Sequence, residues 1–146
     1  ALLQPALTDA NAQVKEAANS AMADWPDATA WDALVSRYRQ PENESQRVLA
    51  LRALVRLAGD LSGAPDAALV ARYRQLLDGV KNDNDRKLIL GAMGGAAHPD
   101  ALELAVPLLG NAGVRAEAEL AVKKIAEAIK AKHPQAAQEA LQKLDR

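Results

Sequence analysis

The sequence predicts an all-α fold of about four helix pairs stacked side by side. A four-residue pattern returns four times along the chain: Asn precedes a basic residue by four positions, and Ala and an apolar residue follow that basic residue by six and seven. The copies are Asn11, Lys15, Ala21 and Met22; Asn43, Arg47, Ala53 and Leu54; Asn82, Arg86, Ala92 and Met93; and Asn111, Arg115, Ala121 and Val122. The basic residues stand 32, 39 and 29 positions apart, a spacing typical of stacked helix pairs.

Composition supports the same fold. The 146 residues are 49% hydrophobic, yet they include only two Trp, two Tyr and no Phe. The core must therefore be built from Ala, Leu, Val and Ile. Ala is the best helix former and lets helices approach closely, so this composition favours helices over a sheet.

Proline marks the start of the other helix in each pair. The triplets are Pro26-Asp27-Ala28, Pro65-Asp66-Ala67, Pro99-Asp100-Ala101 and, in degenerate form, Pro134-Gln135-Ala136. Proline is tolerated in the first turn of a helix, and an acidic residue there interacts favourably with the helix dipole. In chain order we expect helices over 11–24, 27–40, 44–58, 65–79, 83–96, 99–109, 113–130 and 134–145, after the end of one more in residues 1–7.

The Asn-led helices carry one apolar stripe, three, six, seven and ten positions after the basic residue. Its members are Ala18, Ala21, Met22 and Trp25; Ala50, Ala53, Leu54 and Leu57; Ile89, Ala92, Met93 and Ala96; and Ala118, Ala121, Val122 and Ile125. This spacing places them on one face, which predicts the core. The Pro-led helices supply the opposite wall with Trp31, Leu34 and Val35, then Leu69, Val70, Leu76 and Leu77, then Leu102, Ala105, Val106 and Leu109. Pro107 should kink or shorten its helix because it removes a backbone donor.

The repeated Asn and basic residues predict a structural ladder. Each Asn stands where it can cap the second helix of its repeat, and each basic residue is expected to reach a polar group of the adjoining repeat. The ladder comprises Asn11, Lys15, Asn43, Arg47, Asn82, Arg86, Asn111 and Arg115. Contact of these side chains with a phosphate or carboxylate ligand remains the alternative.

Two copies resemble the HEAT repeat family, and more narrowly the bacterial HEAT-like repeats also found in phycobilin lyases. These are Gln46-Arg47 to Ala53-Leu54 and Val114-Arg115 to Ala121-Val122. The resemblance implies a right-handed α-α superhelix in which the second helices line the concave side. It is specific for fold and weak for activity, because the same repeat serves scaffolds, adaptors, lyase subunits and some DNA glycosylases. Asn replaces the more usual Asp, and residues 60–64 form an insertion.

No residue set predicts catalysis, a cofactor or a metal site. The two candidate bases at neutral pH, His98 and His133, both precede a helix-starting proline, so we expect a role in the turn. The sequence around Asp83 and Asp85 lacks the Gly and Glu of a calcium loop. The glycines between 91 and 95 lack the Lys and Ser or Thr of a phosphate loop, and we expect them to permit close packing or to fray the helix.

Composition also disfavours nucleic acid and membrane insertion. Net charge is -1, and no apolar run approaches about 20 residues. The repeated segments 37–40 and 72–75, Arg-Tyr-Arg-Gln, are the best nucleic-acid candidates, but residues two apart point to opposite sides of a helix. We expect the Tyr to pack between repeats beneath the Arg stems. Cysteine is absent, which fits a reducing or an oxidising compartment.

A second row, one, five and nine positions after the basic residue, faces away from the predicted core. It reads Glu16, Ser20, Asp24; Val48, Arg52, Arg56; Lys87, Gly91, Gly95; and Ala116, Leu120, Lys124. On the concave side it would form a shallow trough suited to a partner with acidic and small apolar groups. The candidate binding residues are Arg52, Arg56, Lys87, Leu120 and Lys124, and an ordinary solvated face is the alternative.

We expect one repeat domain over 1–146, divided into pieces at about 1–24, 27–58, 65–96 and 99–130 with a capping helix at 134–145. Because the apolar residues 2, 3 and 7 begin in mid-repeat, we also expect the chain to be the C-terminal part of a longer protein. Three functions stay open: a noncatalytic scaffold that binds a protein partner or positions an attached domain, an accessory subunit or domain of an enzyme of lyase or oxidoreductase type, and a nucleic-acid binder.

Overall fold

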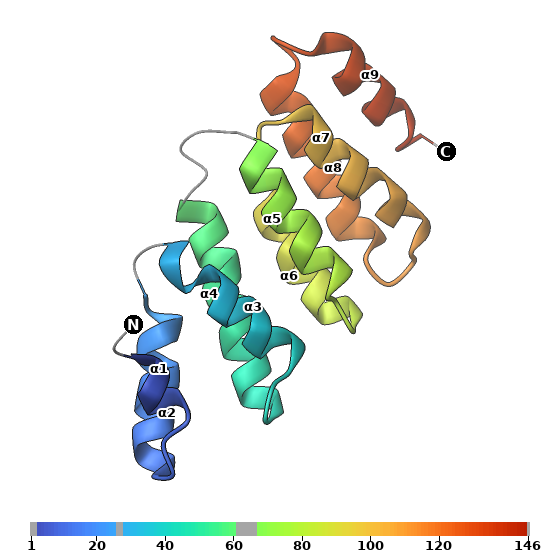
Figure 1. Cartoon of the computed structure of the whole chain (residues 1–146). Helices are drawn as coiled ribbons and strands as arrows, with labels where there is room; N and C mark the ends of the chain where they lie inside the picture. The colour runs from blue at the N-terminus through green and yellow to red at the C-terminus, as the bar shows by residue number, and fades with distance from the viewer. Residues whose placement is uncertain (1–2, 26–27, 61–66, 146) are drawn as a thin grey trace. The chain divides into compact units, whose positions relative to one another are not determined.

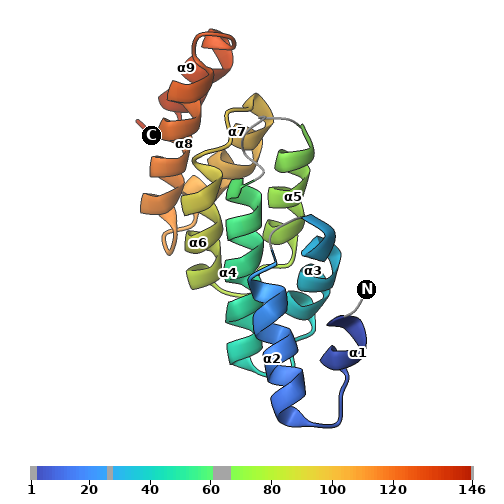
Figure 2. The same ribbon diagram turned by 90° about the vertical axis from the view of Figure 1, so that its left-hand side faces the viewer.

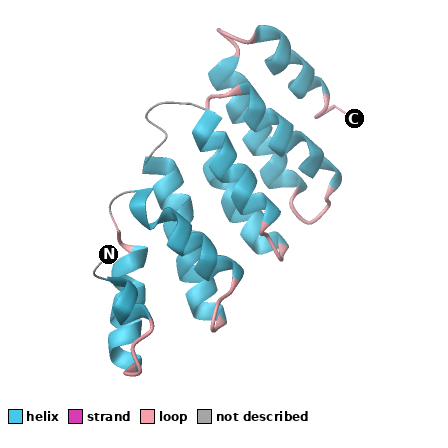
Figure 3. Cartoon of the chain, in the orientation of Figure 1, coloured by secondary structure: helices cyan, strands magenta, loops and turns pink. Residues whose placement is uncertain are grey.

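In a computed structural model of the chain, residues 3–25, 28–60 and 67–145 are described. Regular structure among them is entirely helical, and no strand occurs in these ranges (Figure 3). The all-α prediction is confirmed. The helix starts predicted at Pro26 and Pro65 lie outside the described residues.

Each predicted helix has a counterpart in the structure. The α-helices are α1 (Leu3–Leu7), α2 (Ala12–Ala23), α3 (Trp31–Arg39), α4 (Glu44–Asp60), α5 (Ala67–Asp78), α6 (Asp83–Met93), α7 (Pro99–Ala105), α8 (Arg115–Ile129) and α9 (Pro134–Gln142). Two 3₁₀ helices, η1 (Ala28–Ala30) and η3 (Val106–Gly110), adjoin α3 and α7. Below, α2, α4, α6 and α8 are called the second helices, and α3, α5 and α7 the first helices.

The chain divides into two compact units, Ala1–Leu57 and Ala58–Arg146. In the first unit α1 packs on α2. In both ribbon views α3 lies beside α4 (Figure 1; Figure 2). The largest side chains buried here are Trp31, Leu34 and Tyr38 from α3, with Leu51 and Leu54 from α4. Their burial holds α3 against α4 through the hydrophobic effect.

The second unit has two layers. Helices α5 and α7 contact each other in one layer, and α6 and α8 contact each other in the other. Within each repeat α5 packs on α6 and α7 on α8, and α9 covers both α7 and α8 (Figure 1). The layers bury Leu69, Tyr73 and Leu76 on one side against Ile89 and Met93 on the other. This unit therefore contains two stacked helix pairs and a terminal helix.

The predicted apolar stripe is largely confirmed. Of its members, Ala21 is exposed, Trp25 and Ala92 are half-buried, and the rest are buried. Ala21 is uncovered because α2 packs mainly against α1, which is only five residues long. Trp25 instead donates from Nε1 to Thr29 Oγ1 at 3.1 Å, just after α2 ends.

Pro107 shortens α7 as predicted. The α-helix ends at Ala105, and the chain continues as the 3₁₀ helix η3, with Pro107 among its first residues. At the other end His98 caps the helix: its Nδ1 accepts from Asp100 N at 3.2 Å. The structural role predicted for His98 is confirmed.

Asparagine caps three of the four second helices as predicted. Asn11 Oδ1 accepts from Gln13 N, Asn43 Oδ1 from Gln46 N, and Asn82 Oδ1 from Asp85 N, each at 2.9 Å. The prediction is wrong for the fourth. There α8 begins at Arg115, after a turn in which Asn111 Oδ1 accepts from Gly113 N at 2.9 Å. The residue directly before α8 is Val114, which is fully buried and makes no side-chain cap.

Candidate partner-binding face

The row predicted to face away from the core does so in both units. Ten of its residues are exposed, and Val48 and Lys87 are half-buried. The members in the first unit are Glu16, Ser20, Asp24, Val48, Arg52 and Arg56; those in the second are Lys87, Gly91, Gly95, Ala116, Leu120 and Lys124. We call the solvent side of the second helices, which includes this row, the second-helix face.

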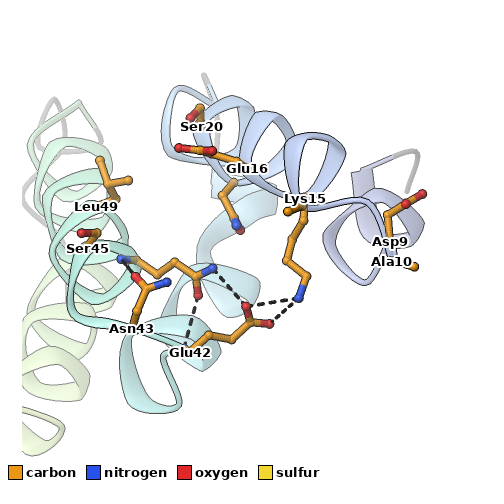
Figure 4. Close-up of a pocket in the computed structure, with 12 residues that line it drawn as sticks. Asp9, Ala10, Lys15, Glu16, Ser20, Glu42, Asn43, Ser45 and Leu49 are labelled. Carbon is orange, nitrogen blue, oxygen red and sulfur yellow. Dashed lines mark hydrogen bonds and ion pairs between the residues drawn. The ribbon is translucent and has the colours of Figure 1, made fainter.

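In the first unit this face contains a groove of about 490 Å³ between α2 and α4 (Figure 4). It is lined by Asp9, Ala10, Ala12, Lys15, Glu16, Asn19, Ser20, Glu42, Asn43, Ser45, Gln46 and Leu49. The size falls within the range of ligand-binding clefts. We call it the α2–α4 groove.

An ion pair crosses the α2–α4 groove. Lys15 Nζ lies 3.1 Å from Glu42 Oε1 and 3.2 Å from Glu42 Oε2, and Gln46 Nε2 donates to Glu42 Oε2 at 3.3 Å (Figure 4). These hydrogen bonds, from Lys15 first and Gln46 second, lower the pKa of Glu42 below its usual value. Glu42 therefore stays ionised and forms an ion pair with the Lys15 ammonium group, the only one among the described residues of the groove lining.

The remaining charge of the groove is acidic. Asp9 Oδ1 accepts from Asn11 N at 2.8 Å, which fixes one oxygen of that carboxylate. Glu16 is exposed and pairs with no other described residue. Beside these carboxylates Leu49 keeps 42% of its surface exposed, so the groove combines negative charge with an apolar patch.

Two polar atoms, one in the groove lining and one in a small depression that adjoins it, have no hydrogen-bond partner among the described residues. They are Asn19 Oδ1, an acceptor, and Arg37 Nη1, a donor, and both are buried. Their side chains line a depression of about 10 Å³ beside Leu49. A buried group left without a partner costs about 1–3 kcal/mol, so Asn19 in the groove and Arg37 in the depression carry unmet hydrogen-bonding capacity.

In the second unit the face is shallower. A depression of about 30 Å³ lies between α6 and α8, and its lining includes Gly91, Gly94, Leu120 and Lys124. Leu120 stands beside it with 51% of its surface exposed. A Cβ added at Gly94 would lie 3.1 Å from Lys124 Cδ, so the small residue lets the Lys124 stem lie close to α6.

The predicted binding residues do not all remain available for a ligand. Arg56 Nη2 donates to the Trp25 carbonyl at 2.8 Å, which ties α4 to the end of α2. Lys87 Nζ lies 3.6 Å from Glu117 Oε1, across from α6 to α8. Arg52, Leu120 and Lys124 are exposed. The structure brings Lys87, Leu120 and Lys124 together on α6 and α8, while Arg52 and Arg56 lie on α4 in the other unit.

Some ladder residues contact another helix pair, and others pair within their own helix. Lys15 reaches the next helix pair through Glu42, and Asn111 Nδ2 reaches Asp83 Oδ1 at 3.4 Å. The three arginines form ion pairs within their own helices: Arg47 with Glu44, Arg86 with Asp83 and Arg115 with Glu119, each with a contact of 2.8 Å. A repeat-to-repeat ladder of all eight residues stays a prediction.

The groove residues Asp9, Glu42 and Leu49 were missed by the sequence reasoning. Residue spacing defines a single row on each helix, whereas the groove is made by the two flanks that α2 and α4 turn toward each other. One feature of the sequence could have indicated the groove: Leu49 stands two positions after Arg47, outside the core stripe, as Leu88 does after Arg86. Both leucines are exposed in the structure.

The Arg-Tyr-Arg-Gln segments do not present their aromatic rings. Tyr38 and Tyr73 are buried, whereas their packing between repeats beneath the Arg stems stays a prediction. Burial raises the pKa of Tyr73 to about 12.

Within the described ranges, no helix is long and apolar enough to cross a membrane, and no three His, Asp or Glu side chains come close enough to hold a metal ion. Compared with known proteins, the chain matches no family model, no curated sequence and no solved structure.

Proposed function

We propose that this chain is a noncatalytic helical-repeat scaffold that binds a protein partner, or positions an attached domain, through its second-helix face. The proposed architecture is a right-handed α-α superhelix of the HEAT-like type. The four sequence copies, and the two stacked helix pairs within the second unit, support this architecture.

One observation carries the proposal. Of the five large apolar side chains that are exposed among the described residues, four lie on second helices, one on each: Val14, Leu49, Leu88 and Leu120. The fifth, Leu141, is on α9. Exposed apolar groups next to polar ones are typical of protein-interaction surfaces. Among the described residues, the first helices have no large apolar side chain that is exposed, although Leu77 and Leu104 are half-buried. Burial of Tyr38 and Tyr73 argues against base stacking on the Arg-Tyr-Arg-Gln segments.

Affinity capture with matched variants tests the proposal. The immobilised chain is exposed to native lysate, beside Arg52→Glu and Leu120→Asp on the second-helix face. Arg74→Glu on α5 and Leu141→Asp on α9 make the same chemical changes at exposed positions elsewhere. Circular dichroism establishes that all four variants are folded.

We expect one or more proteins to be retained by the wild type and by both control variants, and to be lost with either face variant. Truncation at a well-packed contact typically costs more than 1 kcal/mol, or about fivefold in Kd. Retention that is equal for all chains, or that is lost only with the α5 and α9 variants, would contradict the proposal.

A further inference from the structure

We infer that the α2–α4 groove binds a lysine- or arginine-bearing segment of a protein partner, with an apolar side chain of that segment against Leu49. This inference rests on the proposed function and specifies the chemistry of the partner at one part of the face. It differs from the acidic partner that the sequence row predicts, because the groove adds charges that lie outside the row.

Charge complementarity is the first step. The groove contains three carboxylates, from Asp9, Glu16 and Glu42, and one ammonium group, from Lys15. Lys15 is held by Glu42 at 3.1 Å, and the charge of Arg37, which lies in the adjoining depression and not in the groove lining, also acts on Glu42. Asp9 and Glu16 are the carboxylates that remain to balance a cation from outside. The whole chain has a net charge of only -1, so the excess is local to the groove. A cationic side chain is the complement of such a site.

The apolar lining distinguishes a protein segment from a free cation. Leu49 is exposed beside the carboxylates, and the small side chains of Ala10 and Ala12 line the same groove. Lysine and arginine carry long aliphatic stems that pack on such surfaces while their charged ends reach carboxylates. A neighbouring apolar residue of the same segment would cover Leu49, which a small cation cannot do.

Hydrogen-bonding groups along both walls suit a peptide. Ser20 and Asn19 project from α2, and Ser45 and Gln46 from α4. Asn19 Oδ1 is an acceptor that has no partner among the described residues. Acceptors of this kind pair with N–H groups, which both a basic side chain and a peptide backbone supply. The groove volume of about 490 Å³ accommodates a few residues.

Fluorescence anisotropy on the full chain tests the inference with defined probes. The first probe is a labelled peptide of sequence Ala-Lys-Leu-Ala-Lys-Ala. A second replaces each Lys by the uncharged norleucine, a third replaces Leu by Ser, and unlabelled spermine serves as a competitor. Glu16→Lys and Leu49→Ser alter the groove. Asp78→Lys and Leu88→Ser make comparable changes on α5 and α6 in the other unit.

We expect saturable binding of the first peptide, and binding at least about fivefold weaker for the norleucine and Ser peptides. Glu16→Lys should weaken binding by about fivefold or more, because it removes an attractive charge and adds a repulsive one. Leu49→Ser should weaken it by about threefold or more through lost apolar contact. Asp78→Lys and Leu88→Ser should leave the Kd unchanged.

Other results would overturn the inference. No saturable binding, a norleucine peptide that binds equally well, or equal losses in the α5 and α6 variants would exclude a basic segment in this groove. Displacement by spermine together with equal affinity for the Leu and Ser peptides would show a simple cation site. If the peptide fails while affinity capture still depends on Leu120, this inference is wrong and the proposed function stands.

Discussion

Burial of two tyrosines favours one of two interpretations of the Arg-Tyr-Arg-Gln motif. Tyr38 and Tyr73 occupy equivalent places in α3 and α5, and each is about 2% exposed or less. An aromatic ring in this setting stabilises the helix pair by packing and offers no face to a nucleotide base. The flanking arginines alone would give only sequence-independent contact with phosphates.

The raised pKa of Tyr73 predicts a loss of stability at alkaline pH. In the unfolded chain this phenol ionises near pH 10, and in the folded chain only near about 12. Because the unfolded state releases the proton first, the contribution of Tyr73 is fully present below pH 10 and is lost as pH rises toward about 12. Urea unfolding at pH 8, 10 and 11 should show a smaller decline for Tyr73→Phe than for the wild type. Phenolate absorbance from Tyr73 near pH 10 in the folded chain would contradict this.

At the scale of the element, the second helices combine a buried stripe with an open face. Two glycines illustrate this around α6: Gly94, buried just after the helix ends, lets Lys124 pack close, whereas Gly91 within the helix faces solvent with no neighbouring atom within 4 Å of an added Cβ. Close packing therefore explains Gly94 and does not explain Gly91.

Two glycine substitutions in the second unit should have different effects. Gly91→Ala should stabilise the chain by about 0.5–1 kcal/mol, because Ala favours the helix and the added methyl meets nothing. Gly113→Ala should be neutral at best. Its Cβ would lie 2.9 Å from Asp83 Cγ and closer still to Oδ2, displacing the carboxylate that binds Arg86 and Asn111. Urea unfolding measures both, and equal stabilisation by the two would contradict the argument.

The existence and order of the helices followed from periodicity, since packing and helix propensity agree along this chain. Helix starts were predictable where an Asn lies directly before the helix, as at Asn82. They were not where a turn separates the Asn from the helix, as between Asn111 and α8. The row facing solvent was predictable from residue spacing within one helix. The α2–α4 groove was not, because it depends on how the flank of one helix meets that of another, a relation that repeat spacing does not contain.

At the scale of the whole molecule, the two units present their second-helix faces differently. The first unit has an acidic groove crossed by one ion pair, and the second has a shallow depression beside Leu120. A partner that contacts both would meet carboxylates on one unit and an apolar side chain with a lysine on the other. The scaffold hypothesis therefore predicts that, in whichever unit a bound partner contacts, it protects the second helices from solvent and leaves the first helices unprotected.

Hydrogen–deuterium exchange of the full chain, with and without its captured partner, tests this claim most directly. The account predicts slower exchange on binding in α2 and α4 or in α6 and α8, with little change in α3, α5 and α7, because bound protein shields and stabilises the elements it covers. Protection confined to the first helices or to α9 would contradict a partner-binding role for the second-helix face.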